Sequence, residues 1–366
     1  MNPVPVFDLS RQLAPQRAEL ETVVQAVIRR GRFVLGDEVA AFESEFSSYC
    51  GARHAVGVGN GTDALELALR AIGVGPGDRV VTVANAGGYS TSAILACGAT
   101  PLYVDIDAKS LQVRLDDFER AVSTGPRAAI VTHLYGRLAE MHALCRLAAA
   151  RRVPLIEDCA QAHGARLEGQ HAGTFGFLGC FSFYPTKNLG ALGDGGAVIA
   201  QDEALATKLR ALRQYGWQRK YRVDWPGGRN SRLDELQAAV LRHRLPALNG
   251  DNRRRRDIAA RYARLISNRF LEVPKRDSES DAVHLFVVTT RHRDALAAHL
   301  AAAKIGCDVH YPTPDHLQPG WTPPTDVSPL PITEQLAREV LTLPAFPAMT
   351  EEEIARVIDA CNSFAP

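Results

Sequence analysis

The sequence predicts an α/β protein in which a large unit with a mainly parallel central sheet is followed by a smaller α+β unit. Strand and helix patterns alternate from about residue 54 to residue 157, which is typical of a parallel sheet with helices on its faces. The 366 residues are enough for two such units. The sequence pattern changes character after Ile266. We assign residues 1–250 to the large unit and residues 251–366 to the small C-terminal one, so that the helical stretch ending near Ile266 belongs to the small unit.

Short apolar runs predict the strands of the large sheet, at 54–58, 79–83, 101–104, 128–132, 154–157, 181–184 and 197–199. Apolar residues at helical spacing predict helices at 14–30, 37–49, 64–72 and 140–151. In the small unit we expect strands at 282–290 and 307–311, helices at 293–304, 333–341 and 350–362, and a proline-rich segment at 312–331.

Composition and charge exclude several classes of protein. A formal net charge of +1 gives no reason to expect a nucleic acid or an anionic membrane as partner. The seven cysteines are scattered and never form a CxxC pair, which argues against a disulfide framework, and we expect no metal site. No apolar run approaches membrane-spanning length and the N-terminus lacks a signal pattern, so a cytoplasmic location is expected.

The stretch from Phe181 to Ile199 contains the residue with the strongest chemical signal. Lys187 follows Pro185 on a short connection between two apolar runs, in a loop with four glycines. Proline ends the strand pairing because it has no N–H to donate. A lysine in apolar surroundings loses proton affinity, and its neutral amine can form a Schiff base with an aldehyde. The alternative is a surface lysine in a mobile loop.

A carboxylate about thirty residues before Lys187 supplies a partner for it. Asp158 ends an apolar run that begins at Leu155, and open α/β sheets bind ligands at the carboxyl ends of their strands. Pyridoxal phosphate needs a lysine for its aldehyde and an acid for its pyridine nitrogen. An isolated acid at this position is more often a helix cap, but together with Lys187 it predicts a pyridoxal phosphate site.

A glycine turn at residues 59–63 follows the first strand and opens a helix, for which Thr62 or Asp63 is the expected N-cap. The start of a helix presents free backbone N–H groups and the positive end of the helix dipole, and both favour a phosphate group. We therefore expect the cofactor phosphate at Gly61 and Thr62. A capped helix without a ligand is the alternative.

In this order, the blocks GVGNGTDALELALRA, IEDCAQAHGA, SFYPTKNLGALGDGGAV and NSRLDELQAAVLRHRL resemble the nucleotide-sugar aminotransferases of the DegT/DnrJ/StrS group. These are fold-type I pyridoxal phosphate enzymes with an aspartate-aminotransferase-like large domain. The resemblance runs from about Val4 to the C-terminus. It implies that Lys187 carries the cofactor and moves protons, and that Asp158 pairs with the pyridine nitrogen.

The resemblance implies three more cofactor-binding residues. Gln161 would hydrogen-bond the phenolic oxygen, Ser182 would contact the phosphate, and Asn230 would reach the phosphate of the other subunit in a homodimer with shared active sites. Without the resemblance, Gln161 could simply be a polar residue of a loop, and Ser182 could be a small side chain that packs into the interior. Asn230 is equally the N-cap of a helix that begins near Ser231 or Arg232.

The resemblance also implies residues of the sugar pocket. Tyr184, His310 and Tyr311 resemble positions that line it in family members acting at C3 of a hexose. One block departs from the family, because relatives have a proline and a ring-stacking aromatic residue where this chain has VANAGGY, residues 83–89. Tyr89 is the candidate for stacking on the cofactor ring, in a displaced position.

The implied activity is transamination of a nucleotide-linked keto-6-deoxyhexose, carried by dTDP and aminated at C3, with L-glutamate as donor. The cofactor would alternate between pyridoxal 5'-phosphate and pyridoxamine 5'-phosphate. The alternatives are a sugar dehydratase or a 4-aminotransferase on the same scaffold, and a non-catalytic regulator that binds pyridoxal phosphate. Lys187 argues against the dehydratase, whose relatives have histidine at that position.

Overall fold

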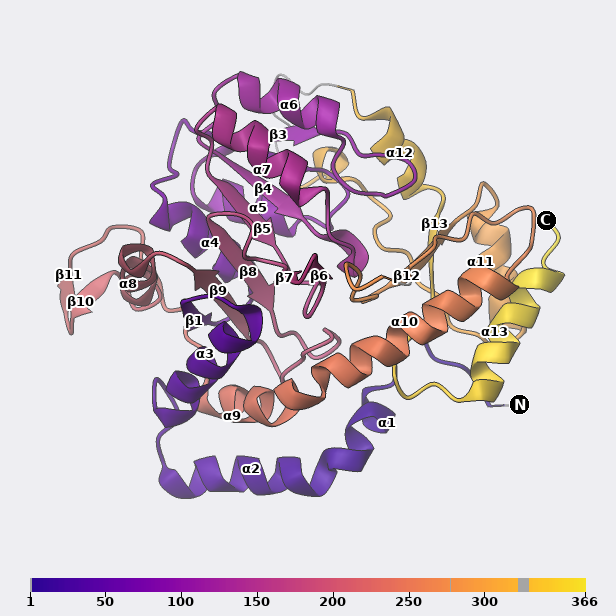
Figure 1. Cartoon of the computed structure of the whole chain (residues 1–366), viewed down its shortest axis with the longest axis horizontal. Helices are drawn as coiled ribbons and strands as arrows, with labels where there is room; N and C mark the ends of the chain where they lie inside the picture. The colour runs from indigo at the N-terminus through magenta and orange to yellow at the C-terminus, as the bar shows by residue number, and fades with distance from the viewer. Residues whose placement is uncertain (1, 277, 322–328) are drawn as a thin grey trace.

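A computed structural model describes every residue except 1, 277 and 322–328, and its centre is a seven-stranded sheet (Figure 1). The strands are β1 (His54–Val58), β2 (Arg79–Val83), β3 (Thr100–Val104), β4 (Ala128–Thr132), β5 (Leu155–Asp158), β8 (Leu178–Ser182) and β9 (Gly196–Ala200). They lie in the order β1-β9-β8-β5-β4-β2-β3, and only the two pairings of β9 are antiparallel. The predicted α/β fold with a mainly parallel sheet is confirmed.

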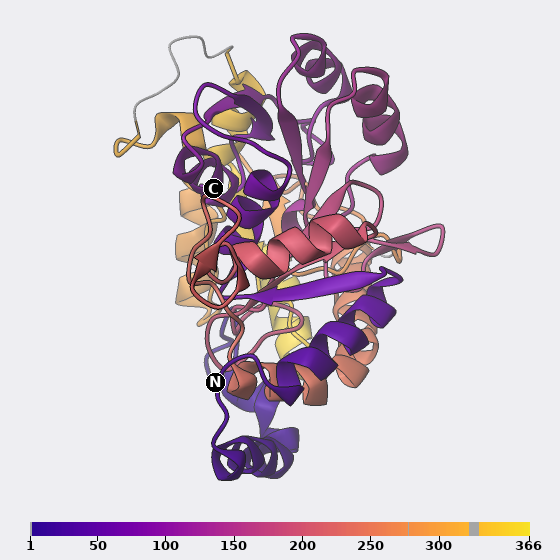
Figure 2. The same ribbon diagram turned by 90° about the vertical axis from the view of Figure 1, so that its left-hand side faces the viewer.

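Helices cover both faces of this sheet. One face packs against α4 (Gly61–Ala71), α5 (Tyr89–Ala96) and α8 (Glu203–Leu212). The other face packs against α3 (Asp37–Cys50), α6 (Leu115–Ser123), α7 (Met141–Ala150) and α9 (Glu235–Arg244). Figure 2 looks onto the β1 edge and shows α8 and α3 on opposite sides of that strand. Consecutive residues of a strand point to opposite faces of the sheet, and accordingly Val56 belongs to the core that includes α8 while Ala55 belongs to the core that includes α3.

The small unit is built around two antiparallel strands that lie far apart in the sequence. It contains α10 (Leu248–Leu265), β12 (Phe286–Thr289), α11 (Arg293–Ala302), α12 (Pro331–Ala337), β13 (Val340–Leu343) and α13 (Glu351–Ser363). Strands β12 and β13 pair in antiparallel fashion, and α11 and α13 pack with them in one core. The described residues also form α1 (Leu9–Leu13), α2 (Arg17–Arg30), β6 (Arg166–Leu167), β7 (Gln170–His171), β10 (Trp217–Arg219), β11 (Arg222–Val223) and short 3-10 helices at 14–16, 134–136, 245–247 and 315–317.

Three of the predicted elements need correction. The predicted helix 333–341 ends at Ala337, and residues 340–343 form β13 because their backbone pairs with β12. The predicted strand 307–311 is reduced to an isolated bridge between Asp308 and Thr342. The predicted strand 181–184 begins at Leu178 and leaves the sheet after Ser182. Part of the predicted proline-rich segment, residues 322–328, lies outside the described residues.

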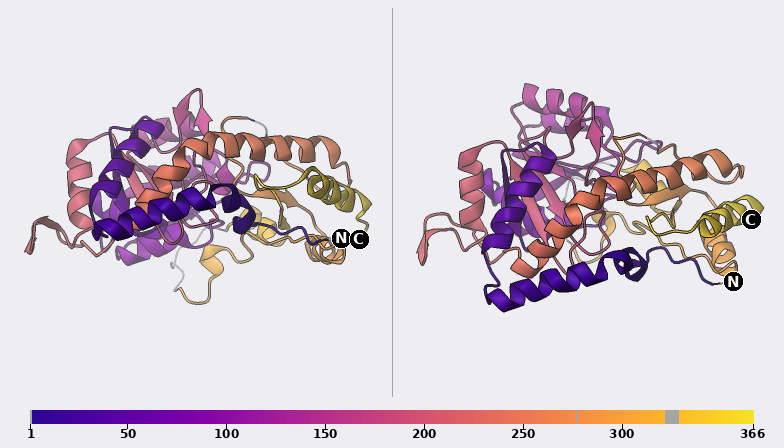
Figure 3. Two further views of the ribbon diagram at one scale, coloured as in Figure 1. Left: turned by 90° about the horizontal axis from the view of Figure 1, so that it is seen from below. Right: turned by 60° about the horizontal axis from the view of Figure 1, so that its bottom comes forward.

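The N-terminal residues pack with the small unit, although the large unit follows them in the sequence. Val4 is fully buried in the core of the small unit and forms a parallel bridge with Ile305. Both views of Figure 3 accordingly place the N- and C-termini beside one another. The domain boundary at residue 250 stays a prediction, and it falls in the first turn of α10, the long helix that links the two units.

No helix within the described part of the chain is both long enough and apolar enough to cross a membrane.

Candidate active site

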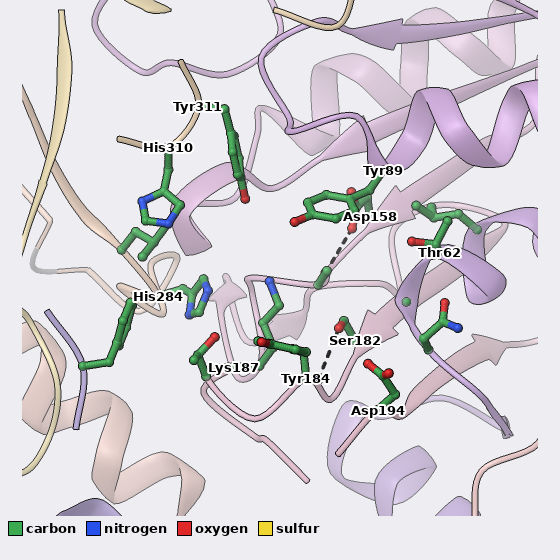
Figure 4. A pocket seen from close by; sticks show the side chains of 17 residues that line it. Thr62, Tyr89, Asp158, Ser182, Tyr184, Lys187, Asp194, His284, His310 and Tyr311 are labelled. Atoms are coloured by element: carbon green, nitrogen blue, oxygen red, sulfur yellow. Dashed lines mark hydrogen bonds between the residues drawn. The ribbon is translucent and has the colours of Figure 1, made fainter. Parts of the chain in front are cut away.

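A cavity of about 540 Å³ opens where β5 and β8 end and α4 begins. Figure 4 shows side chains from both units of the fold turned toward it. Most of the predicted site residues line this cavity, namely Gly61, Thr62, Tyr89, Asp158, Ser182, Tyr184, Lys187, His310 and Tyr311. Gln161 and Asn230 are the two predicted residues that do not line it.

Lys187 is placed by the turn that follows β8. Its backbone N–H donates to the Tyr184 carbonyl at 2.8 Å, and Phe183 anchors the chain just before this turn by packing edge-on against Phe42 and Phe46. Burial lowers the pKa of Lys187 to about 8, while the nearby Asp158 carboxylate acts in the opposite direction. A substantial fraction of this amine is therefore neutral near physiological pH, as a nucleophile for an aldehyde requires.

Asp158 is the last residue of β5 and is held by hydrogen bonds on both carboxylate oxygens. One oxygen accepts the Ala160 N–H at 3.1 Å, and the other accepts the Thr132 hydroxyl at 3.2 Å. Burial raises the pKa of Asp158, and those contacts together with Lys187 oppose the shift. A protonated ring nitrogen beside this carboxylate would replace its lost hydration, which fits the predicted partner of a pyridine nitrogen.

The start of α4 forms the opposite end of the cofactor region. Its N-cap is Asn60 and not Thr62 or Asp63 as predicted, because Asn60 has an extended backbone and its side-chain oxygen accepts the Asp63 N–H at 2.8 Å. The backbone N–H groups of Gly61 and Thr62 have no acceptor among the described residues. Unpaired donors at a helix start are suited to a phosphate group.

Gly61 brings Ser182 to the same place. A Cβ atom on residue 61 would lie 2.6 Å from the Ser182 Cβ, so only glycine allows the end of β8 to approach the first turn of α4 this closely. An amine, a carboxylate and a group of phosphate donors therefore face one cavity (Figure 4). This is the donor set that the aldehyde, the ring nitrogen and the phosphate of pyridoxal phosphate require, and the residues fit that cofactor.

Gln161 lies behind the cavity wall. Its side-chain oxygen accepts the Tyr135 N–H at 2.5 Å, and its amide nitrogen donates to the Tyr311 hydroxyl at 3.1 Å. In this arrangement Gln161 supports Tyr311. Its predicted hydrogen bond to the cofactor stays a prediction.

The block that departs from the family, residues 83–89, accommodates two aromatic side chains of the small unit. Gly87 and Gly88 have φ values of +77° and +85°. A Cβ on Gly87 would lie 2.8 Å from the Tyr311 ring, and one on Gly88 would lie 2.7 Å from Trp321. Tyr89 then begins α5, packs edge-on against Tyr311 at 6.2 Å between ring centroids, and remains 49% exposed. Its stacking on a cofactor ring stays a prediction.

Asn230 is exposed on the segment that precedes α9 and forms an isolated bridge with Gln214. The alternative in which Asn230 caps a helix is wrong, because α9 begins at Glu235 and Asp234 is its N-cap residue. The segment between Asn230 and Asp234 is not helical and contacts the rest of the large unit instead, where the Ser231 hydroxyl accepts the Gly59 N–H at 2.9 Å.

Among the cavity residues that were not predicted from the sequence, Asp194, Phe7 and His284 carry polar or aromatic side chains. Asp194 lies in the motif GDGG just after Lys187, and that motif was a usable signal. Phe7 and His284 also line the cavity. Nothing in the local sequence of either residue indicates a site, because their positions depend on how the small unit and the N-terminus pack.

One buried cluster, His133, Glu157 and Cys159, has metal-ligating residue types. The Glu157 carboxylate is already saturated, since it accepts three backbone N–H groups of the loop 173–176 at 2.6–2.8 Å and contacts the His133 Nε2 at 3.0 Å. These contacts make Glu157 the anchor of that loop.

The comparisons with known proteins agree with this geometry. The sequence model of the DegT/DnrJ/EryC1/StrS aminotransferase family matches residues 15–362. The chain is 44% identical to the dTDP-3-amino-3,4,6-trideoxy-α-D-glucose transaminase of Streptomyces venezuelae, covering 99% of this chain and 96% of that protein. The crystal structure of S. venezuelae DesV in complex with a ketimine intermediate has a TM-score of 0.94 at 43% identity, with 99% and 98% of the two chains covered. The structure of NtdA from Bacillus subtilis with bound cofactor PMP has a TM-score of 0.91 at 30% identity, with 99% and 85% covered.

Proposed function

The chain belongs to the DegT/DnrJ/EryC1/StrS aminotransferase family, and from this premise we propose that it transfers an amino group to a nucleotide-linked ketosugar with pyridoxal phosphate as cofactor. The observation that carries the proposal is the placement of Lys187 and Asp158 on one cavity with the open start of α4. Together these three groups match the aldehyde, the ring nitrogen and the phosphate of pyridoxal phosphate.

When bound, pyridoxal phosphate supplies an aldehyde that exchanges an amino group and a ring that stabilises negative charge on the adjacent carbon. Lys187 holds the cofactor through its Nζ and afterwards moves a proton to or from the reacting carbon. Asp158 keeps a proton on the ring nitrogen through its carboxylate. Gly61 and Thr62, through their backbone N–H groups, and Ser182, through its hydroxyl, bind the phosphate.

The substrate is a dTDP-linked keto-6-deoxyhexose that is aminated at C3, and L-glutamate is the amino donor. The similarity to a transaminase named for a dTDP-3-amino sugar supports this choice. Tyr184, His310 and Tyr311 line the same cavity as Lys187, within reach of a sugar bound there. Retention of Lys187 favours transamination over dehydration.

The decisive assay combines the holoenzyme with L-glutamate and a set of dTDP-linked 3-keto and 4-keto sugars, and identifies the aminated carbon by NMR. We expect turnover of a 3-keto sugar to its 3-amino product. Amination at C4, or no turnover of any dTDP-linked ketosugar with glutamate or glutamine, would refute the proposal.

The chain acts as a homodimer in which Asn230 of one subunit reaches the cofactor phosphate of the other. Asn230 is exposed and is not among the residues that line the cavity of its own subunit, which supports this arrangement. Mixing the Lys187→Ala and Asn230→Ala variants tests it, because a mixed dimer with shared sites has one fully native site. Activity above the sum of the separate variants is expected, and no recovery would argue against shared sites.

The cytoplasm is the proposed location of the enzyme. All seven cysteines are free, which supports a reducing compartment.

A further inference from the structure

His284 is a buried histidine in the cavity wall to which the proposed reaction assigns no task. It is 4% exposed and lines the same cavity as Lys187. Figure 4 shows its ring on the side of Lys187 that faces His310. Its Nδ1 lies 3.1 Å from the side-chain oxygen of Asn188, the residue that follows Lys187.

The direction of this hydrogen bond is fixed by two backbone carbonyl groups. The Asn188 amide nitrogen donates to the Ala282 carbonyl at 2.8 Å, and a carbonyl oxygen can only accept. Asn188 also donates to the Asn252 side-chain oxygen at 2.8 Å, and the orientation of Asn252 is set by its own donation to the His163 carbonyl at 2.7 Å. The oxygen of the Asn188 amide must therefore face His284, and it requires an N–H there.

His284 accordingly has its proton on Nδ1, which leaves a lone pair on Nε2. That nitrogen forms no hydrogen bond with any residue that the structure describes. The Phe7 ring packs nearly parallel to the imidazole, at 6.3 Å between centroids and an interplanar angle of 27°, and so limits rotation of the ring. The result is a hydrogen-bond acceptor held in a fixed orientation in the cavity wall.

Burial and the neighbouring basic groups keep His284 in this neutral form. Burial holds the pKa of His284 well below its usual value, and the positive charge of Lys187 acts in the same direction. Arg255, His163 and His310, which face His284 from the elements packed around it, also disfavour a second proton.

We propose that Nε2 of His284 accepts a hydrogen bond from a hydroxyl group of the sugar substrate and thereby selects sugars that have this hydroxyl. The inference rests on the proposed function and names a residue for its specificity. A neutral acceptor attracts a hydroxyl proton and repels carboxylate oxygens. His284 therefore serves the sugar half of the reaction and offers no site for the carboxylates of the amino donor.

The test uses dTDP-glucose and its monodeoxy analogues as unreactive probes, with binding to the holoenzyme measured by calorimetry. One deoxy analogue should bind the native enzyme about tenfold more weakly than dTDP-glucose, since the analogue leaves the buried acceptor unpaired. In His284→Phe, which keeps the ring shape, the two ligands should bind equally. His284→Gln should retain part of the discrimination because its amide oxygen can accept, and Phe7→Leu, which keeps Nε2, should retain it fully.

A second readout does not depend on any ligand. The measurement is 15N NMR of the native holoenzyme labelled with [15N]histidine. The His284 signals are identified as those that disappear in His284→Gln, and they should show a protonated Nδ1 and an unprotonated Nε2. A proton on Nε2, or equal discrimination by the native enzyme and His284→Phe, would overturn the inference. If the native holoenzyme binds no nucleotide sugar while these nitrogen signals are as expected, the proposed function fails and the inference fails with it.

Discussion

The two ends of the cavity are built in different ways. The cofactor end uses the last residues of β5 and β8 and the first residues of α4, and its carboxylate, Asp158, is 5% exposed. The substrate end uses loops contributed by both units, and its Tyr184 is 52% exposed. The end of β5 and the short turn after β8 hold the groups that perform the chemistry, whereas longer loops form the part that meets a variable substrate.

This difference predicts two kinds of mutational effect. A change at the cofactor end should reduce the chemical step or the binding of the cofactor. A change at the substrate end should raise KM for the sugar while cofactor binding stays unchanged.

Asp158→Asn should give the largest of these effects, a loss of about 10²- to 10³-fold in kcat. The amide can still contact Thr132, but it has no charge to keep a proton on the ring nitrogen. Steady-state kinetics with glutamate and the ketosugar measure the change in both half-reactions. An increase in KM with kcat unchanged would mean that Asp158 binds substrate and does not act on the cofactor ring.

Gly61→Ala should weaken pyridoxal phosphate binding roughly 10- to 100-fold, because the added Cβ would lie 2.6 Å from the Ser182 Cβ. Gly75→Ala is the matched control, since a Cβ there meets no atom within 4 Å. Cofactor titration followed by absorbance gives both affinities. Equal affinities in the two variants would show that the contact between α4 and β8 does not shape the phosphate site.

Uptake of pyridoxal phosphate by the apoenzyme should accelerate about tenfold between pH 7 and pH 9. The pKa of Lys187 is lowered from the usual lysine value to about 8, so the neutral and reactive form of the amine increases through this range. Stopped-flow absorbance measures the rate. A rate that rises only above pH 10 would mean that the cavity does not shift the pKa of Lys187.

The smallest effect is expected at the substrate end. Gly87→Ala should displace the Tyr311 ring, because the added Cβ would lie 2.8 Å from it, and should raise KM for the sugar roughly three- to tenfold. Gly77→Ala controls for backbone strain, because Gly77 also has a positive φ (+86°) but its Cβ would meet no atom within 4 Å. A loss of cofactor affinity in Gly87→Ala alone would remove the distinction between the two ends.

The same contrast explains what could be predicted from the sequence. Lys187 and Asp158 were found because each lies in a short motif next to a strand end, and the parallel sheet brings strand ends together. His284 and Asn188 were missed because they are 96 residues apart, and only the folded chain shows that they touch.

Errors in the predicted elements have a similar origin. Residues 340–343 have apolar spacing that fits a helix as well as a strand, and pairing with the distant β12 decides between them. The N-cap of α4 was placed too late because Asn60, Thr62 and Asp63 are all good capping residues, and only the backbone conformation selects Asn60.

The most direct test of the account is chemical labelling of the native holoenzyme. Borohydride reduction followed by peptide mapping should attach the cofactor to Lys187, and the Lys187→Ala variant should remain unlabelled. A label on any other residue, or no label on the native enzyme, would contradict the central claim that this amine holds pyridoxal phosphate opposite Asp158.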